Sequence, residues 1–138
     1  MNKEKNYANM MLGLLNHHKI QLNSAIDEID IIMSYKEDID ITDSYYTFKI
    51  ERLEKVKNAI ESYLNKVYDT FKILSDEEQQ VFILLYEDKL KVSEASKRLN
   101  ISRDKIYSIR KNICLKYNWL DDNKKKISTN NYSGQVFN

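Results

Sequence analysis

Cationic and hydrogen-bonding side chains gather in one short stretch of the sequence, and their chemistry suits a polyanion. An arginine or lysine can pair with the acceptor edge of guanine, and an aspartate can accept from the amino group of cytosine. Other cations of the stretch are suited to phosphates, which supply affinity without sequence choice. The candidate DNA-binding residues are Lys97, Arg98, Ser102, Arg103, Asp104, Lys105, Tyr107, Ser108, Arg110 and Lys111.

These side chains need helices to present them, and the local sequence predicts two helices joined by a turn. Ser93 and Ser102 each stand where a helix N-cap is wanted. A short helix would end at Leu99, and Asn100 between the helices tolerates the left-handed conformation that such turns often require. The last helix should run from Arg103 to about residue 119, with an apolar face formed by Ile106, Ile109, Ile113 and Tyr117. This is the pattern of a helix-turn-helix.

A further helix should precede this pair. Ser75 and Glu78 have the spacing of a capping box, and two more acids stand between them at the positive end of the expected helix. The helix would carry an apolar run from Val81 to Tyr86 and stop near residues 87–89. Ser96 is small where the two later helices should cross.

The order of these features from residue 74 to residue 113 is specific. It begins with Leu-Ser-x-x-Glu and continues with an apolar run that ends in tyrosine. A separate glutamate follows, and a Leu-turn-Ile-Ser step then precedes the last helix. These are Leu74, Ser75 and Glu78; Val81 to Tyr86; Glu94; Leu99-Asn100-Ile101-Ser102; and Arg103 onward. The order resembles region 4 of bacterial sigma-70-type factors, which implies an all-α unit whose last helix enters the major groove.

The chain departs from that family at two positions and in length. Ser96 stands where the family usually has alanine, and Asn100 stands where it usually has glycine. The promoter-melting region of the family has no counterpart, so we do not expect a complete sigma factor. The layout is similar to small phage transcription regulators of the ArpU and RinA type, and this resemblance implies regulation of phage or mobile-element genes.

The N-terminal half predicts an antiparallel helical hairpin. Apolar residues recur at helical spacing from Tyr7 to Tyr35 and again from Tyr45 to Leu74, where the pattern approaches a heptad seam. The segment Lys36–Ser44 breaks the pattern and should be a turn. We therefore expect an all-α chain with a hairpin at residues 1–73, a region-4-like unit at 74–120 and a disordered polar tail at 121–138.

The net charge of +1 conceals an uneven distribution along the 138 residues. Residues 1–88 hold ten basic and seventeen acidic side chains, and residues 89–138 hold twelve basic and four acidic ones. The first part therefore carries a charge of −7 and the second +8. The basic part is the candidate for contact with a polyanion, although charges of this kind also solvate ordinary helix faces.

Composition argues against several other classes. Two glycines and no proline leave no material for a glycine-rich phosphate loop. Cys114, His17 and His18 cannot form a four-ligand zinc site, and no nucleophile–base set or carboxylate pair can be assembled. We expect no enzyme activity, no metal, no cofactor and no membrane span, and a cytoplasmic location. His18 and Cys114 are interpreted as packing residues.

The sequence thus predicts a sequence-specific DNA-binding transcription regulator that reads the major groove with the helix after Ser102. The hairpin would serve a homodimer or docking. The alternative is an interaction protein that grips RNA polymerase, as a region 4 mimic or antagonist, without reading DNA. Exposed apolar surface on the helix at Ser75–Tyr86 would favour this alternative, and a basic face across Lys97, Arg103 and Lys111 would favour DNA.

Overall fold

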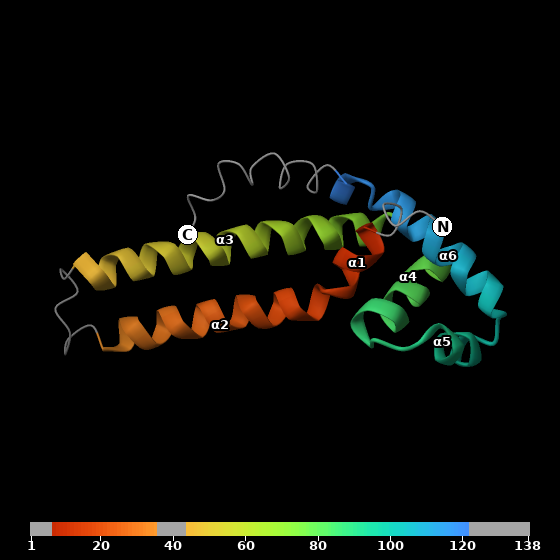
Figure 1. The fold of residues 1–138 in the computed structure, drawn as a ribbon, viewed down its shortest axis with the longest axis horizontal. Coiled ribbons are helices and arrows are strands. Elements are labelled where there is room, and N and C mark those ends of the chain that lie inside the picture. Colours follow the sequence, from red (N-terminus) through yellow and green to blue (C-terminus); the bar gives the residue numbers. More distant parts are fainter. Residues whose placement is uncertain (1–6, 36–43, 122–138) are drawn as a thin grey trace. The chain divides into compact units, whose positions relative to one another are not determined.

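The computed structural model describes residues 7–35 and 44–121, and every regular element within these ranges is helical (Figure 1). The expected all-α class is therefore confirmed for these residues. By contact the chain divides into two compact units, one of Asn16–Asp69 and one that combines the residues up to Leu15 with those from Thr70. The elements are α1 (Tyr7–Gly13), α2 (Leu15–Ser34), α3 (Ser44–Lys72), α4 (Asp76–Phe82), the π-helical η2 (Ile83–Glu87), α5 (Val92–Leu99) and α6 (Arg103–Lys116).

The first expected helix is interrupted. The periodicity predicts one helix from Tyr7 to Tyr35, but the structure has a break at Leu14 between α1 and α2. Gly13 at this point has weak helix propensity, and its carbonyl oxygen accepts from Lys89 Nζ at 2.6 Å instead of from a backbone amide of the next turn. Leu12, just before the break, is fully buried, whereas Leu14 at the break is 41% exposed.

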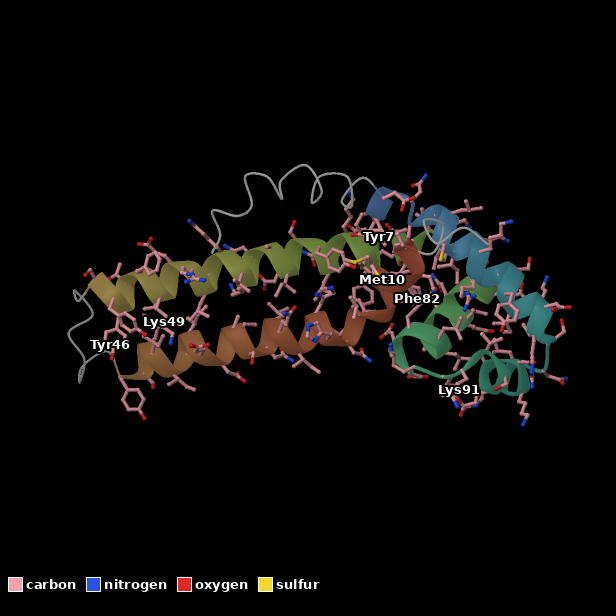
Figure 2. All side chains as sticks on the ribbon, in the orientation of Figure 1. Tyr7, Met10, Tyr46, Lys49, Phe82 and Lys91 are labelled. Carbon is pink, nitrogen blue, oxygen red and sulfur yellow. The ribbon has the colours of Figure 1, made fainter. Side chains whose placement is uncertain are left out.

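Contacts between three pairs of side chains join α2 to α3 within the unit Asn16–Asp69, and the partners follow one another in opposite chain order. His18 lies edge-on to Tyr63 with ring centroids 5.1 Å apart, and Glu28 pairs with Lys49 at 3.0 Å. Lys19 lies over the ring of Tyr68. The two helices accordingly run side by side in opposite directions, with Lys49 pointing from α3 toward α2 (Figures 1 and 2).

The buried set of this unit is small. Among the residues of the unit that the structure describes, the buried hydrophobic side chains are Ala25, Ile32, Leu64 and Val67. Val56 of α3 is 48% exposed, and Ile20 and Ile31 of α2 are more than half exposed. Two helices alone cannot enclose their apolar stripes, because each helix leaves one flank of its stripe uncovered.

The second unit has a dense aromatic core around Phe82, which lies at the end of α4 (Figure 2). The Phe82 ring contacts Phe71 at 5.1 Å and Tyr86 at 5.2 Å, and it stacks on Tyr117 at 5.8 Å. Trp119 Nε1 donates to Thr70 Oγ1 at 3.0 Å. Aromatic pairs of this kind add ~0.5–1.5 kcal/mol each beyond burial, so these contacts tie Tyr117 and Trp119 to the end of α3.

The boundary of this unit differs from the expected division at residue 73. Thr70 and Phe71 take part in its core, and α1 joins it as well, because the Tyr86 hydroxyl donates to Asn9 Oδ1 at 2.6 Å and Lys89 bonds Gly13. The apolar periodicity of α1 continues into α2 without interruption, so nothing in the sequence indicated that α1 packs against the segment around Tyr86 and Lys89.

The helix that begins after Ser75 ends as expected, but its last turn is π-helical. The Asp88 amide donates to Ile83 O at 2.8 Å, and the Leu90 amide donates to Leu84 O at the same distance. Lys89 then has a positive φ of 59°. The wider turn keeps both Leu84 and Tyr86 buried while the chain leaves the helix.

Two expectations fall mainly on residues outside the described ranges: the disordered tail at 121–138, of which only Asp121 is described, and the turn at Lys36–Ser44, of which only Ser44 is described, as the first residue of α3. Among the helices that the structure does describe, none combines the length and the apolar character required to cross a membrane.

Candidate nucleic-acid interface

The start of α5 is not capped as expected. Ser93 lies inside the helix, which begins at Val92 with Lys91 as the N-cap residue. The Glu94 carboxylate reaches back to accept from the Lys91 amide at 2.9 Å, while the Lys91 carbonyl accepts from the amides of Glu94 and Ala95. The expectation for Ser93 is therefore wrong by two residues, because the glutamate supplies the reciprocal half of a capping box without a serine at the cap.

The turn between α5 and α6 has the expected conformation. Asn100 lies in the left-handed region with φ 57° and ψ 45°, and the Ile101 amide donates to Ser96 O at 3.1 Å. The Ser96 hydroxyl also donates to the Ile101 carbonyl. Ser96 is thus small enough for the crossing of α5 and α6 and also bonds the turn to α5.

Ser102 caps α6. It is in an extended conformation, and its hydroxyl accepts from the Lys105 amide at 3.1 Å. The expected apolar face of α6 is confirmed, since Ile106, Ile109, Ile113 and Tyr117 are all buried. The helix ends at Lys116 rather than near residue 119, with Tyr117 as its C-cap and a short helical stretch at 119–121. This packing leaves the opposite face of α6 exposed.

The candidate DNA-binding residues lie on that exposed face and at the end of α5. Arg110 is partly buried, and every other member of the set is exposed: Lys97, Arg98, Ser102, Arg103, Asp104, Lys105, Tyr107, Ser108 and Lys111. Within the described part of the chain, Arg103 and Lys111 form no salt bridge, and neither do Lys97 and Arg98. Their charges are available to a ligand.

Other cations of α6 are already partnered. Lys105 Nζ lies 3.9 Å from Glu77 Oε1, with both side chains about half exposed. Lys116 Nζ lies 2.6 Å from Glu78 Oε1, and the Glu78 carboxylate is nearly buried. Lys116 is therefore engaged in holding α6 to α4.

The electrostatics of Glu78 follow from these contacts. Burial by itself raises the pKa of the Glu78 carboxyl group, but hydrogen bonds from Lys116 and from the Ser75 amide outweigh burial and hold that pKa below its ordinary value of 4.5. Glu78 therefore stays ionised near neutral pH, and its capping contact is charge-assisted.

A second basic feature escaped the sequence analysis. A pocket of about 490 Å³ opens between α1, the segment from η2 to α5, and α6, all within one compact unit. We call it the cationic pocket; its polar lining includes Asn9, Lys89, Lys91, Arg103, Tyr107 and Arg110. None of its lining residues is acidic. The lysines before Val92 were visible in the sequence, but nothing there indicated that they would face α6.

The remaining candidates have packing roles. Burial raises the pKa of the Cys114 thiol, with smaller opposing effects from Tyr86 and Arg110, so the thiol is not an activated nucleophile. His18 is partly buried, and its Nδ1 lies 3.3 Å from Gln21 Oε1. The described residues contain no group of three or more histidine, cysteine, aspartate or glutamate side chains placed to hold a metal ion.

Comparison with known proteins found no matching family model, no matching curated protein and no matching solved structure. Functional inference therefore depends on the geometry of α5, α6 and the cationic pocket.

Proposed function

We propose that this protein is a sequence-specific DNA-binding transcription regulator that inserts α6 into the major groove. The observation that carries the proposal is the α5–α6 pair. Left-handed Asn100 and capped Ser102 separate two short helices, and the N-terminal half of α6 is polar and exposed. In a helix-turn-helix, residues of this half contact base edges.

The residues divide by role. Arg103, Asp104, Tyr107, Ser108 and Lys111 would face base edges, with Lys105 beside them. Lys97, Arg98 and Arg110 would contact phosphates. Lys105 would have to exchange its contact with Glu77 for a contact with DNA. An exposed ion pair of that kind contributes only ~0–1 kcal/mol, so the exchange is inexpensive.

The resemblance to sigma-70 region 4 supports this function. The motif order at residues 74–113 matches that region, and the layout matches small phage regulators of the ArpU and RinA type. The proposed arrangement is therefore a helix-turn-helix preceded by an antiparallel hairpin, with phage or mobile-element genes as targets and the cytoplasm as the place of action.

The unit Asn16–Asp69 would serve oligomerisation or docking. Its buried core is small, and it exposes several large apolar side chains, among them Ile20, Ile31, Phe48 and Val56. A second copy of the chain that pairs its own α2 and α3 with these would cover such surfaces, as in a four-helix bundle. Homodimerisation would also suit a two-fold symmetric DNA site.

The alternative is docking to RNA polymerase without DNA contact. That function would need exposed apolar surface on the helix that follows Ser75. Val81, Phe82 and Leu84 are buried, and Ile83, at 39% exposure, is the large exposed hydrophobic residue of this helix. The burial of α4 and η2 favours DNA over this alternative.

Selection of bound sequences from a random duplex pool, followed by titration at several salt concentrations, tests the proposal. We expect enrichment of a defined site and an affinity that falls steeply with salt, because neutralised phosphates release counterions. Absence of DNA binding at low salt would reject the DNA-binding function and favour the alternative, docking to RNA polymerase.

A further inference from the structure

The cationic pocket is built from three separate parts of one compact unit. Asn9 and Gly13 come from α1, Lys89 and Lys91 come from the segment between η2 and α5, and Arg103, Tyr107 and Arg110 come from α6. Figure 2 shows Lys91 on the segment that leads into α5. Four cations thus line one concavity, although they are up to 21 residues apart in the sequence.

Hydrogen bonds hold the walls of the pocket in place. Lys89 has a left-handed backbone, and its Nζ donates to Gly13 O at 2.6 Å, which leaves two further protons on the ammonium group. The Tyr86 hydroxyl bonds Asn9 at 2.6 Å. Arg110 lies over the ring of Tyr107, with its guanidinium carbon 5.0 Å from the ring centroid. The pocket is therefore formed before any ligand arrives.

The positive charge of the cationic pocket is not neutralised by any acidic residue in its lining. At its edge, the Glu94 carboxylate accepts from the backbone amide of Lys91. Lys91 and Arg103 form no salt bridge within the described residues. Like charges around one cavity repel one another, and a bound anion would relieve this repulsion.

We propose that the cationic pocket binds a phosphate group, held by Lys91, Arg103 and Arg110. Arginine forks suit phosphate oxygens because they donate two parallel hydrogen bonds, and lysine supplies a point charge. The volume of about 490 Å³ falls within the range of ligand sites and leaves room for the rest of a molecule that carries the phosphate.

Two kinds of molecule carry a phosphate group that would suit this pocket. One is a backbone phosphodiester of the duplex that α6 reads, because the pocket borders Arg103 at the start of α6. In that form the inference rests on the proposed function and adds Lys91 to the interface. The other is a phosphate monoester of a small molecule, which would bind the free protein.

The experiment uses the full chain with Lys91→Gln and Arg110→Gln, each of which removes one pocket charge. Lys55→Gln is the matched control, since it removes one charge from an exposed lysine of the other compact unit. Thermal unfolding of each variant verifies that the fold is retained. One arm measures affinity for a duplex at two salt concentrations. The other titrates the free protein with inorganic phosphate, at ionic strength matched with chloride, and follows the amide resonances of Lys91 and Arg103.

In the duplex arm, each lost phosphate contact should lower the salt slope by about one unit. A fourfold rise in salt would then weaken the pocket variants ~3.5-fold less than the wild type and Lys55→Gln. Saturable phosphate shifts that both pocket variants abolish would instead establish the monoester source, even if the protein binds no DNA and the proposed function fails. Wild-type salt slopes in both pocket variants, together with no saturable phosphate shift, would overturn the inference while leaving DNA binding intact.

Discussion

Replacement of Lys116 by methionine tests how α6 is held to α4. Lys116 Nζ lies 2.6 Å from Glu78 Oε1, and the side chains are 39% and 11% exposed. The same carboxylate oxygen accepts from the Ser75 amide at 2.9 Å. Lys116→Met would leave a nearly buried carboxylate with its amide donor but without its cation.

The expected cost lies between two reference cases. Breaking a fully buried ion pair costs ~3–5 kcal/mol, and breaking an exposed one costs ~0–1 kcal/mol. Because Glu78 is nearly buried, Lys116 is partly solvated and the Ser75 amide remains, we expect a loss of ~1–3 kcal/mol in the free energy of unfolding. Glu78→Gln in the Lys116→Met background should recover part of this loss, since a neutral amide oxygen can still accept from Ser75.

The effect should depend on pH with a defined sign. The pKa of Glu78 in the folded protein lies below the ordinary value of 4.5. Its stabilising contribution is therefore complete above about pH 4.5 and is lost as the pH falls through the lower folded pKa. The difference in stability between the wild type and Lys116→Met should be largest near neutral pH and shrink in acid.

Urea unfolding followed by the fluorescence of Trp119 measures this difference. Trp119 is the only tryptophan of the chain, and it bonds Thr70 within the same compact unit as the ion pair. Lys105→Met is the matched control, because Lys105 lies 3.9 Å from Glu77 with both side chains about half exposed and should contribute little. Equal losses in the two variants, or a loss in Lys116→Met that is independent of pH, would refute the reasoning.

Further substitutions address α6 and the end of α5, the turn between these helices, and the unit Asn16–Asp69. Arg103→Ala should flatten the sequence preference and lower the affinity for the selected site alone, by ~1–3 kcal/mol. Lys97→Ala should lower the affinity for all DNA sequences and reduce the salt slope by about one. Titration of both variants against selected and scrambled duplexes measures these effects, and the reverse pattern would contradict the proposal that α6 contacts the base edges. Asn100→Val should lower the free energy of unfolding by ~1–2 kcal/mol because a branched residue is strained at a φ of 57°, and Asn100→Gly should not; equal urea midpoints would show that the turn relaxes. Leu64→Asp should lower the free energy of unfolding by at least ~2–5 kcal/mol, because Leu64 is 8% exposed. Circular dichroism should show a loss of helicity, and sedimentation should show the loss of any dimer. An unchanged signal in both measurements would place Leu64 outside the core.

Several local features of the fold could be predicted because their partners lie within a few residues. The Ser75–Glu78 capping box, the left-handed Asn100 and the Ser102 cap are all confirmed. In each case a side chain bonds a backbone group about one helical turn away, or a single residue tolerates a particular φ. The buried face of α6 was equally predictable, since helical periodicity alone places Ile106 and Ile113 on one side.

Other features depended on contacts between distant residues. The break at Leu14 accompanies the bond from Lys89 to Gly13, 76 residues along the chain. The expected helix Tyr7–Tyr35 had a continuous apolar pattern, so its sequence contained no stop signal apart from one glycine. The N-cap at Ser93 failed for a local reason, because the Glu94 carboxylate shifts the start of α5 to Val92.

The sequence by itself determined the all-helical class, the caps at Ser75 and Ser102, the turn at Asn100, and a basic C-terminal part that could meet a polyanion. Only the tertiary structure decided which cations have protein partners and which do not. It brought Lys91 beside Arg103 and Arg110 in one pocket, and it turned Lys116 toward Glu78. The physical reason is that helix formation depends on groups about one turn apart, whereas the neighbour of a long charged side chain depends on how separate helices pack.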